Sequence, residues 1–222
     1  MTTFRIAVIG GTGPQGKGLA YRWARHGHEV VIGSRSAEKA VATAHEVGDR
    51  VGAEGGAPVV SGATNAEAAA GAEVVVLAVP YDGHDELVAS LAEDLAGKTV
   101  ISCVNPLGFD KRGPYGLDVE RSAAEAAAEL APDATVVGAF HHVSAVSLWS
   151  KAEYLDHEDV LVCGDSAEGK EVAQELARSV TSRIGIDAGM LRLARQLEPL
   201  TAVLISINKA YKVRSGIRIS GI

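Results

Sequence analysis

The chain has 222 residues, a formal net charge of −7 and 47% hydrophobic residues, a composition typical of globular proteins. That length buries a sizeable core without disulfides or structural metals. The acidic balance argues against binding to nucleic acid or to an anionic membrane. No apolar stretch reaches 18 residues, and Cys103 and Cys163 lie in separate apolar runs without metal-ligand spacing. We therefore expect a cytoplasmic protein with buried thiols and no metal site.

Short apolar runs alternate with Ala-rich helical patterns over most of the chain. Strands are predicted at 4–9, 29–33, 73–79, 99–103, 134–140 and 159–163. Helices are predicted at about 15–26, 36–47, 65–70, 84–95 and 120–130, and the longest loop at 104–118. Continuous apolar strands that alternate with helices are typical of a parallel sheet covered on both faces. We therefore expect an α/β fold, a Rossmann-type doubly wound parallel sheet with right-handed crossovers.

The pattern changes near residue 165, after which two helical stretches, 166–181 and 188–211, follow without a strong strand between them. The second stretch contains LEPLTAVLISI, which is apolar on nearly every face and must be buried on all sides. Pro199 inside it should end or kink the helix near Glu198. We expect a Rossmann domain over 1–165 and a small C-terminal helical region over 166–222, packed against a second subunit in a homodimer.

A glycine-rich segment, Gly11-Thr12-Gly13-Pro14-Gln15-Gly16, joins the first predicted strand to the first predicted helix. In this context Gly11 would allow the tight turn, Gly13 would let the backbone approach a pyrophosphate, and Gly16 would permit close helix–strand packing. Pro14 fits the first helical turn, where free N–H groups bind phosphate oxygens. The segment predicts a dinucleotide site.

The end of the second predicted strand indicates which dinucleotide is bound. Proteins that prefer NAD place a carboxylate there to bind the ribose 2′-hydroxyl. This chain has Ser34 and Arg35 instead, with Lys39 one helical turn later. A hydroxyl and two cations favour a 2′-phosphate, so NADP is preferred over NAD. The alternative is a solvated basic corner.

Three later strand ends should border the nicotinamide, because ligands cross the carboxyl ends of strands in such sheets. Pro80 and Pro106 each follow a strand, where they either border the ligand or only terminate the strand. His141 and His142 follow another strand, and on an extended chain at most one would face the cleft. His141 is either that cleft residue or a structural histidine. No catalytic triad or carboxylate pair occurs, so the chemistry would belong to cofactors.

Several segments are similar to one known family. They are VIGGTGPQGKGLA, HEVVIGSRSAEKA, LAVPYD, ERSAAEAAAE, FHHVSA, VCGD, LEPLT and SGIRI. Over nearly its whole length the chain resembles the NADPH:coenzyme F420 oxidoreductases, and ERSAAE, VCGD and the histidine segment are the most particular to them. The resemblance implies an oxidoreductase that transfers hydride directly between NADP(H) and the deazaflavin coenzyme F420, its co-substrate.

Residue roles follow from the resemblance where the motifs match. It implies that Thr12 to Gln15 contact the pyrophosphate and that Ser34, Arg35 and Lys39 contact the 2′-phosphate. It implies that Val79 and Pro80 flank the nicotinamide and that Ala145 touches it from another segment. It places His141 and Val143 at the junction with the deazaflavin, as the catalytic pair, and Ser215 against the deazaflavin. The reacting carbons would meet at about 3–3.5 Å. His142 and Ser144 depart from the family pattern.

Two other functions fit parts of the sequence. A reductase of a small imine or carbonyl substrate, similar to pyrroline-carboxylate reductase, would share the N-terminal site and a helical dimerising tail. Such an enzyme needs polar substrate-binding groups in the C-terminal helix, where aliphatic residues dominate. A non-catalytic NADP-sensing protein would bind NADPH without transferring hydride.

Overall fold

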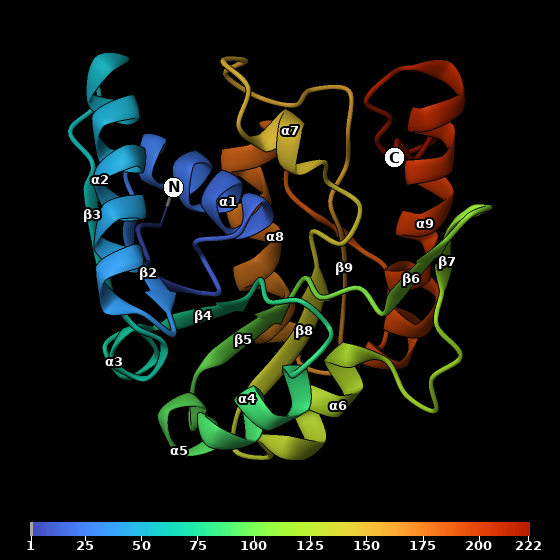
Figure 1. The fold of residues 1–222 in the computed structure, drawn as a ribbon, viewed down its shortest axis with the longest axis horizontal. Coiled ribbons are helices and arrows are strands. Elements are labelled where there is room, and N and C mark those ends of the chain that lie inside the picture. The colour runs from blue at the N-terminus through green and yellow to red at the C-terminus, as the bar shows by residue number, and fades with distance from the viewer. Residues whose placement is uncertain (1) are drawn as a thin grey trace.

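A single eight-stranded sheet runs through the computed structural model, which describes residues 2–222 (Figure 1). The strands lie in the order β10-β9-β8-β5-β4-β1-β2-β3. Their bounds are Arg5–Ile9 (β1), Glu29–Ser34 (β2), Val59–Thr64 (β3), Val74–Leu77 (β4), Thr99–Ser102 (β5), Thr135–Ala139 (β8), Leu161–Gly164 (β9) and Ile186–Asp187 (β10). The order reverses between β1 and β4, which is the switch point where such folds bind ligands.

Helices cover both faces of this sheet (Figure 1). One face packs against α1 (Pro14–Arg25), α2 (Ala37–Ala53) and α8 (Ala167–Thr181). The other packs against α3 (Asn65–Ala70), α4 (His84–Ser90), α5 (Ala92–Leu95) and α6 (Ala123–Leu130). Neighbouring strand residues such as Ala7 and Val8 belong to opposite core clusters. Burial on both faces explains why the strands read as continuous apolar runs.

The α/β architecture and the six predicted strands are confirmed, each to within two residues at either end. Some helix bounds differ. Helix α2 extends to Ala53, and the helix expected over 84–95 is two short helices separated by Leu91. The sheet is mostly parallel, but β9 pairs with β8 in the antiparallel sense. The connection between them contains only the short α7 (Ala145–Leu148), and a parallel return needs a full crossover element.

Three short strand regions were not predicted. Strand β3 lies at the sheet edge and is partly exposed, and β10 has only two residues. The expected loop 104–118 contains a hairpin of β6 (Leu107–Asp110) and β7 (Gly113–Gly116). Because this segment is rich in Gly and Pro, its sequence indicated a loop and not a pair of strands. Because β10 joins the sheet after residue 165, the sheet continues into the predicted C-terminal region.

The C-terminal helix α9 (Ala194–Tyr211) follows a 3₁₀ turn at Leu191–Leu193 and lies beside β7 (Figure 1). Pro199 was expected to end or kink this helix near Glu198, and it does not end it, because the helix continues for three more turns. Pro199 is near the N-terminus of α9, where its missing N–H removes only one backbone hydrogen bond. Nowhere in residues 2–222 is a helix both long enough and apolar enough to cross a bilayer.

Candidate active site

The glycine turn between β1 and α1 is tightly packed. Gly10 has a φ of +72°, so the left-handed residue of the turn is Gly10 and not the expected Gly11. A Cβ on Gly11 would lie 2.7 Å from the Val8 carbonyl oxygen, and a Cβ on Gly16 would lie 2.7 Å from the Gly11 Cα. Both glycines therefore lie behind the turn, and they allow α1 to approach the strand ends.

Helix α1 opens toward this turn with free backbone donors. Pro14 is its first residue, the N-cap Gly13 supplies no side-chain hydrogen bond, and no acidic residue lies in the first turn. A groove of about 590 Å³ runs past this helix end. Its lining includes nine of the expected dinucleotide contacts: Thr12, Gly13, Pro14, Gln15, Ser34, Arg35, Lys39, Val79 and Pro80. Free N–H groups at a helix N-terminus suit a phosphate anion.

The basic corner of this groove is built by the end of β2 and the start of α2. The Ser36 hydroxyl caps α2 by accepting from the Lys39 amide at 3.3 Å, which places the Lys39 side chain one turn along. Arg35 and Lys39 are exposed, and neither forms an ion pair within residues 2–222. No carboxylate follows β2 at the usual position. Two cations and a hydroxyl at this corner suit a phosphate more than a hydroxyl group.

A second, smaller cleft of about 330 Å³ adjoins the groove, and both are lined by Gln15, Ala78 and Val79. Six expected site residues line this cleft although they are distant in the sequence: Gln15, Val79, His141, Val143, Ala145 and Ser215. Pro80 lies in the groove and not in the cleft. One face of α9 completes the wall with Thr201, Leu204, Ile205 and Asn208. The cleft therefore continues from the nicotinamide end of the groove.

The turn after β8 forms one side of this cleft. Phe140 is fully buried with a φ of +62°, a conformation that bulky residues rarely adopt. Hydrogen bonds hold the turn from three elements. Gln15 Nε2 donates to the Phe140 carbonyl at 3.3 Å, while Asn105 Nδ2 and Thr201 Oγ1 donate to the His141 carbonyl at 2.9 and 2.7 Å.

His141 and His142 both line the cleft, so the expectation that only one would face it is wrong. That expectation assumed an extended chain, whereas the backbone turns at Phe140. The two rings differ in their contacts, since His142 Nε2 lies 3.2 Å from the Asp159 carbonyl. Within residues 2–222, neither ring nitrogen of His141 has a partner in full hydrogen-bond geometry, although the Val104 backbone favours a proton there.

The titratable groups of the cleft are uncharged near neutral pH. Burial, with a smaller contribution from His142, lowers the pKa of His141 to about 3, and burial lowers the pKa of His142 to about 4. Burial also raises the pKa of the Cys103 thiol to about 12. Among the residues that the structure describes, no Asp, Glu, Lys or Arg lines the cleft. The cleft is therefore neutral, and its titratable side chains are not poised to exchange a proton near neutral pH.

Asn105 and Thr201 are site residues that the sequence did not single out. Asn105 stands at the end of a predicted strand before a proline, and Thr201 lies in the LEPLT motif. The sequence therefore marked Asn105 as a strand-end residue and Thr201 as a motif residue, without indicating what either one does. Their shared target, the His141 carbonyl, depends on the left-handed turn at Phe140, which no local pattern indicates.

Ser215 reaches the cleft because the segment after α9 folds back. The Ser215 amide donates to Asn208 Oδ1 at 2.5 Å, and its hydroxyl donates to the Leu204 carbonyl at 3.4 Å. Asp159 holds the next residues, since its amide donates to the Ile217 carbonyl and its carboxylate accepts from the Ile219 amide. These contacts fix the C-terminal segment against the cleft.

Comparison with known proteins agrees with this geometry. Residues 5–106 match the family model of coenzyme F420-dependent NADP oxidoreductases. The F420-dependent NADP reductase of Methanothermobacter thermautotrophicus is 41% identical over 98% of this chain and 95% of its own length. The crystal structure of a candidate F420-dependent NADP reductase from Arthrobacter sp. FB24 is 32% identical, covers 98% of this chain and 99% of its own, and has a TM-score of 0.79.

A pyrroline-5-carboxylate reductase from Coxiella burnetii shares the fold, with a TM-score of 0.59. The match covers 95% of this chain and 71% of the other, but the two sequences are only 16% identical. That likeness concerns the fold alone. The sequence match to the F420-dependent enzymes extends over nearly the whole chain at far higher identity. The chain therefore belongs to the family of F420-dependent NADP reductases.

Proposed function

We propose that this protein transfers hydride directly between NADP(H) and the deazaflavin coenzyme F420. The observation that carries the proposal is the continuity of the two cavities. The phosphate groove leads through Gln15, Ala78 and Val79 into a neutral cleft. A dinucleotide in the groove would present its nicotinamide to that cleft, and hydride would pass from carbon to carbon between two stacked rings.

The groove residues would hold NADP by its phosphates. The free N–H groups of α1 and the loop from Thr12 to Gln15 would bind the pyrophosphate. Ser34, Arg35 and Lys39 would bind the 2′-phosphate. Gly11 and Gly16 would contribute through the shape of the turn, because no larger residue fits behind it. Val79 and Pro80 would flank the nicotinamide.

The cleft residues would align the second ring and exclude water. Val143 and Ala145 supply one apolar wall, α9 supplies another, and Ser215 borders the cleft from the C-terminal segment. His141 would contact the junction of the two rings as a neutral imidazole. Formation of NADPH from the reduced deazaflavin also releases a proton. Since no charged side chain lines the cleft, that proton would leave to solvent.

The same lining argues against the two alternative functions. Pyrroline-5-carboxylate carries a carboxylate, and no Lys or Arg of residues 2–222 lines the cleft. Of the polar groups that α9 places there, the Thr201 hydroxyl donates to the His141 carbonyl and the Asn208 side-chain oxygen accepts from the Ser215 amide. A silent NADP sensor would not need a second cleft that continues from the nicotinamide end of the groove.

We also propose a homodimer, with residues 166–222 supplying both deazaflavin and dimer contacts. Val203, Ile207 and Tyr211 are spaced four residues apart on α9 and are 52%, 36% and 75% exposed. They lie on a different face of α9 from the cleft residues, which stand at 201, 204, 205 and 208. A second copy of the chain would cover this apolar stripe. The cytoplasmic location stays a prediction.

The direct test mixes purified protein, NADPH and oxidised F420 and follows the visible chromophore of the deazaflavin. We expect loss of the chromophore together with oxidation of one NADPH per deazaflavin reduced. NADH in place of NADPH should give a much slower reaction. Binding of NADPH without any loss of the chromophore would support the sensor and contradict the proposal.

A further inference from the structure

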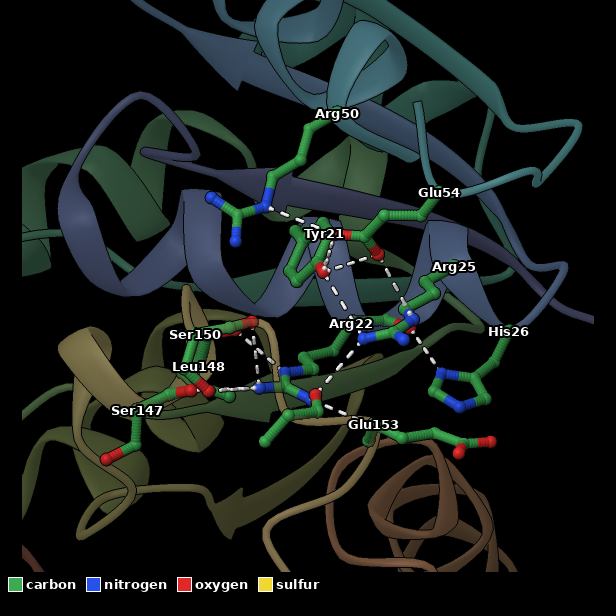
Figure 2. Close-up of polar contacts among 11 residues, drawn as sticks. Tyr21, Arg22, Arg25, His26, Arg50, Glu54, Ser147, Leu148, Ser150 and Glu153 are labelled. Carbon is green, nitrogen blue, oxygen red and sulfur yellow. Dashed lines mark hydrogen bonds and ion pairs between the residues drawn. The ribbon is translucent and has the colours of Figure 1, made fainter. Parts of the chain in front are cut away.

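Arg22, on α1, is a buried cation outside the groove and the cleft. Its side chain is fully buried, and its guanidinium reaches into the segment 147–153, which comprises the last two residues of α7 and the irregular chain after them (Figure 2). It donates to backbone carbonyls at Leu148 (2.7 Å), Ala152 (2.6 Å), Ser147 and Glu153 (both 2.9 Å), with a longer contact at Ser150 (3.5 Å). It also donates to the Ser150 hydroxyl at 3.1 Å. One side chain thus organises seven residues of backbone.

Backbone oxygens surround this charge. Within residues 2–222 no carboxylate forms an ion pair with Arg22, and burial lowers the pKa of its guanidinium. Burying a cation without an ion partner is costly, and an apolar residue would avoid that cost. Leu148 is the last residue of α7, so its carbonyl has no partner in the next helical turn, while the Ser147 carbonyl also accepts from the Ser150 amide at 3.1 Å. Arg22 therefore fixes where α7 ends and how the following segment runs.

This segment is linked to the cleft through α7. Ala145, the first residue of α7, lines the cleft, and Val143 precedes it. Helix α1 touches the same element at Gly18, where an added Cβ would lie 2.7 Å from the Leu148 Cβ. The N-terminus of α1 borders the phosphate groove. One helix therefore contacts the groove at one end and sets the position of a cleft wall at the other.

We propose that Arg22 is a positioning residue for hydride transfer. By holding 147–153 on α1, it sets the Val143–Ala145 wall relative to the phosphate groove, and so sets the approach of the second ring to the nicotinamide. This inference rests on the proposed function. A displacement of about 1 Å can slow a reaction about 100-fold without loss of binding, because rate depends on alignment far more steeply than affinity does.

The test compares Arg22→Lys with Arg25→Lys by single-turnover hydride transfer from NADPH to F420. Lysine keeps the charge but cannot donate to this spread of carbonyls. Arg25 is the matched control, since it lies on the same helix, donates to the Ala152 carbonyl at 3.1 Å and pairs with Glu54 at 3.3 Å. We expect the Arg22→Lys rate to fall about 10–100-fold with little change in the NADPH dissociation constant. The single-turnover rate of Arg25→Lys should stay close to that of the parent protein.

A second variant covers the case in which Arg22→Lys does not fold. Gly18→Ala moves α7 away from α1 without touching Arg22, and alanine favours the helix more than glycine does. It should also slow hydride transfer while NADPH binding is kept. For Arg22→Ala, added guanidinium should restore part of the rate, whereas ammonium should not.

Two results would overturn the inference. In the first, hydride transfer in Arg22→Lys equals the parent rate. In the second, rate, NADPH binding and melting temperature all fall in parallel in both variants, which would make Arg22 a purely structural residue. A parent protein that transfers no hydride to F420 would instead refute the proposed function, so the two failures are distinguishable.

Discussion

Arg35 and Lys39 define the charge at the adenosine end of the groove. They are exposed and unpaired within residues 2–222, so each is available to a 2′-phosphate. This corner was predictable because it depends only on which residues follow the second strand. The local sequence determines where the second strand ends, and the residues that follow that strand end form the basic corner of the groove.

Arg35→Ala should raise the Michaelis constant for NADPH about 10–100-fold, because it removes a charge-assisted bond worth about 1.5–3 kcal/mol. The constant for NADH should change little. Steady-state kinetics with both nucleotides measure this, with Arg192→Ala, an exposed arginine on another element, as the control. An unchanged preference for NADPH in Arg35→Ala would contradict the assignment of this corner.

His141 is buried and neutral, and this restricts its chemical role. Since its pKa lies near 3, the ring is a neutral imidazole between pH 5 and 8 and has no imidazolium proton to give. His141→Asn should therefore slow single-turnover hydride transfer without changing the shape of its pH profile. Stopped-flow measurements across that pH range, on both proteins, provide the check. An inflection near pH 6–7 that disappears in the variant would mean that His141 exchanges a proton.

At the scale of elements, the Phe140 turn and the C-terminal segment were not predictable from the sequence. The left-handed φ of Phe140 depends on packing against Trp23, with ring centroids 5.6 Å apart, and on hydrogen bonds from Gln15, Asn105 and Thr201. Those residues come from distant parts of the chain. Local periodicity indicated the strand before the turn but could not indicate the turn.

The C-terminal segment packs over Glu158, a fully buried carboxyl group. Neither of its oxygens has a hydrogen-bond partner within residues 2–222, and a side chain at Gly216 would overlap it. The Arg22 charge acts on this carboxyl and favours its ionised form, and His157 Nε2 lies 3.4 Å from Oε1. Burial raises the pKa of Glu158 to about 7, so the folded protein holds this group protonated at mildly acid pH.

A raised pKa makes stability depend on pH in a definite direction. The unfolded chain loses this proton near pH 4.5 and the folded protein near pH 7, so the contribution of Glu158 is complete below pH 4.5 and is lost as pH rises through 7. Glu158→Gln should raise the free energy of unfolding at pH 8 by about 1–3 kcal/mol and remove that slope. Urea denaturation at pH 5 and pH 8 measures both effects. Equal stability of the parent and Glu158→Gln at pH 8 would show that the Glu158 carboxylate is solvated or paired at that pH, and would contradict this account.

For the whole molecule, the sequence predicted the layered α/β architecture because strands buried on both faces are uniformly apolar. It did not predict the direction of β9 or the passage of α9 through Pro199. Both depend on features outside the local hydrophobic pattern of each element. The connection before β9 lacks a crossover helix, and the Pro199 ring packs on Gly116 of the hairpin.

The apolar stripe on α9 predicts an assembly of two chains. Ile207→Glu places a charge in the middle of that stripe and should shift the protein from dimer to monomer in analytical ultracentrifugation. Lys209→Glu, a charge change on the same helix away from the stripe, should leave the dimer intact. A parent protein that sediments as a monomer at all concentrations would disprove the dimer.

The central claim is direct transfer of hydride from carbon to carbon between the two rings. NADPH carrying deuterium at the transferred position on carbon 4 should deliver that deuterium to the deazaflavin carbon, detected by mass spectrometry of the reduced product. In deuterated water, unlabelled NADPH should give a product without deuterium at that carbon. Solvent deuterium at that carbon, or loss of the label from NADPH to water, would contradict the account.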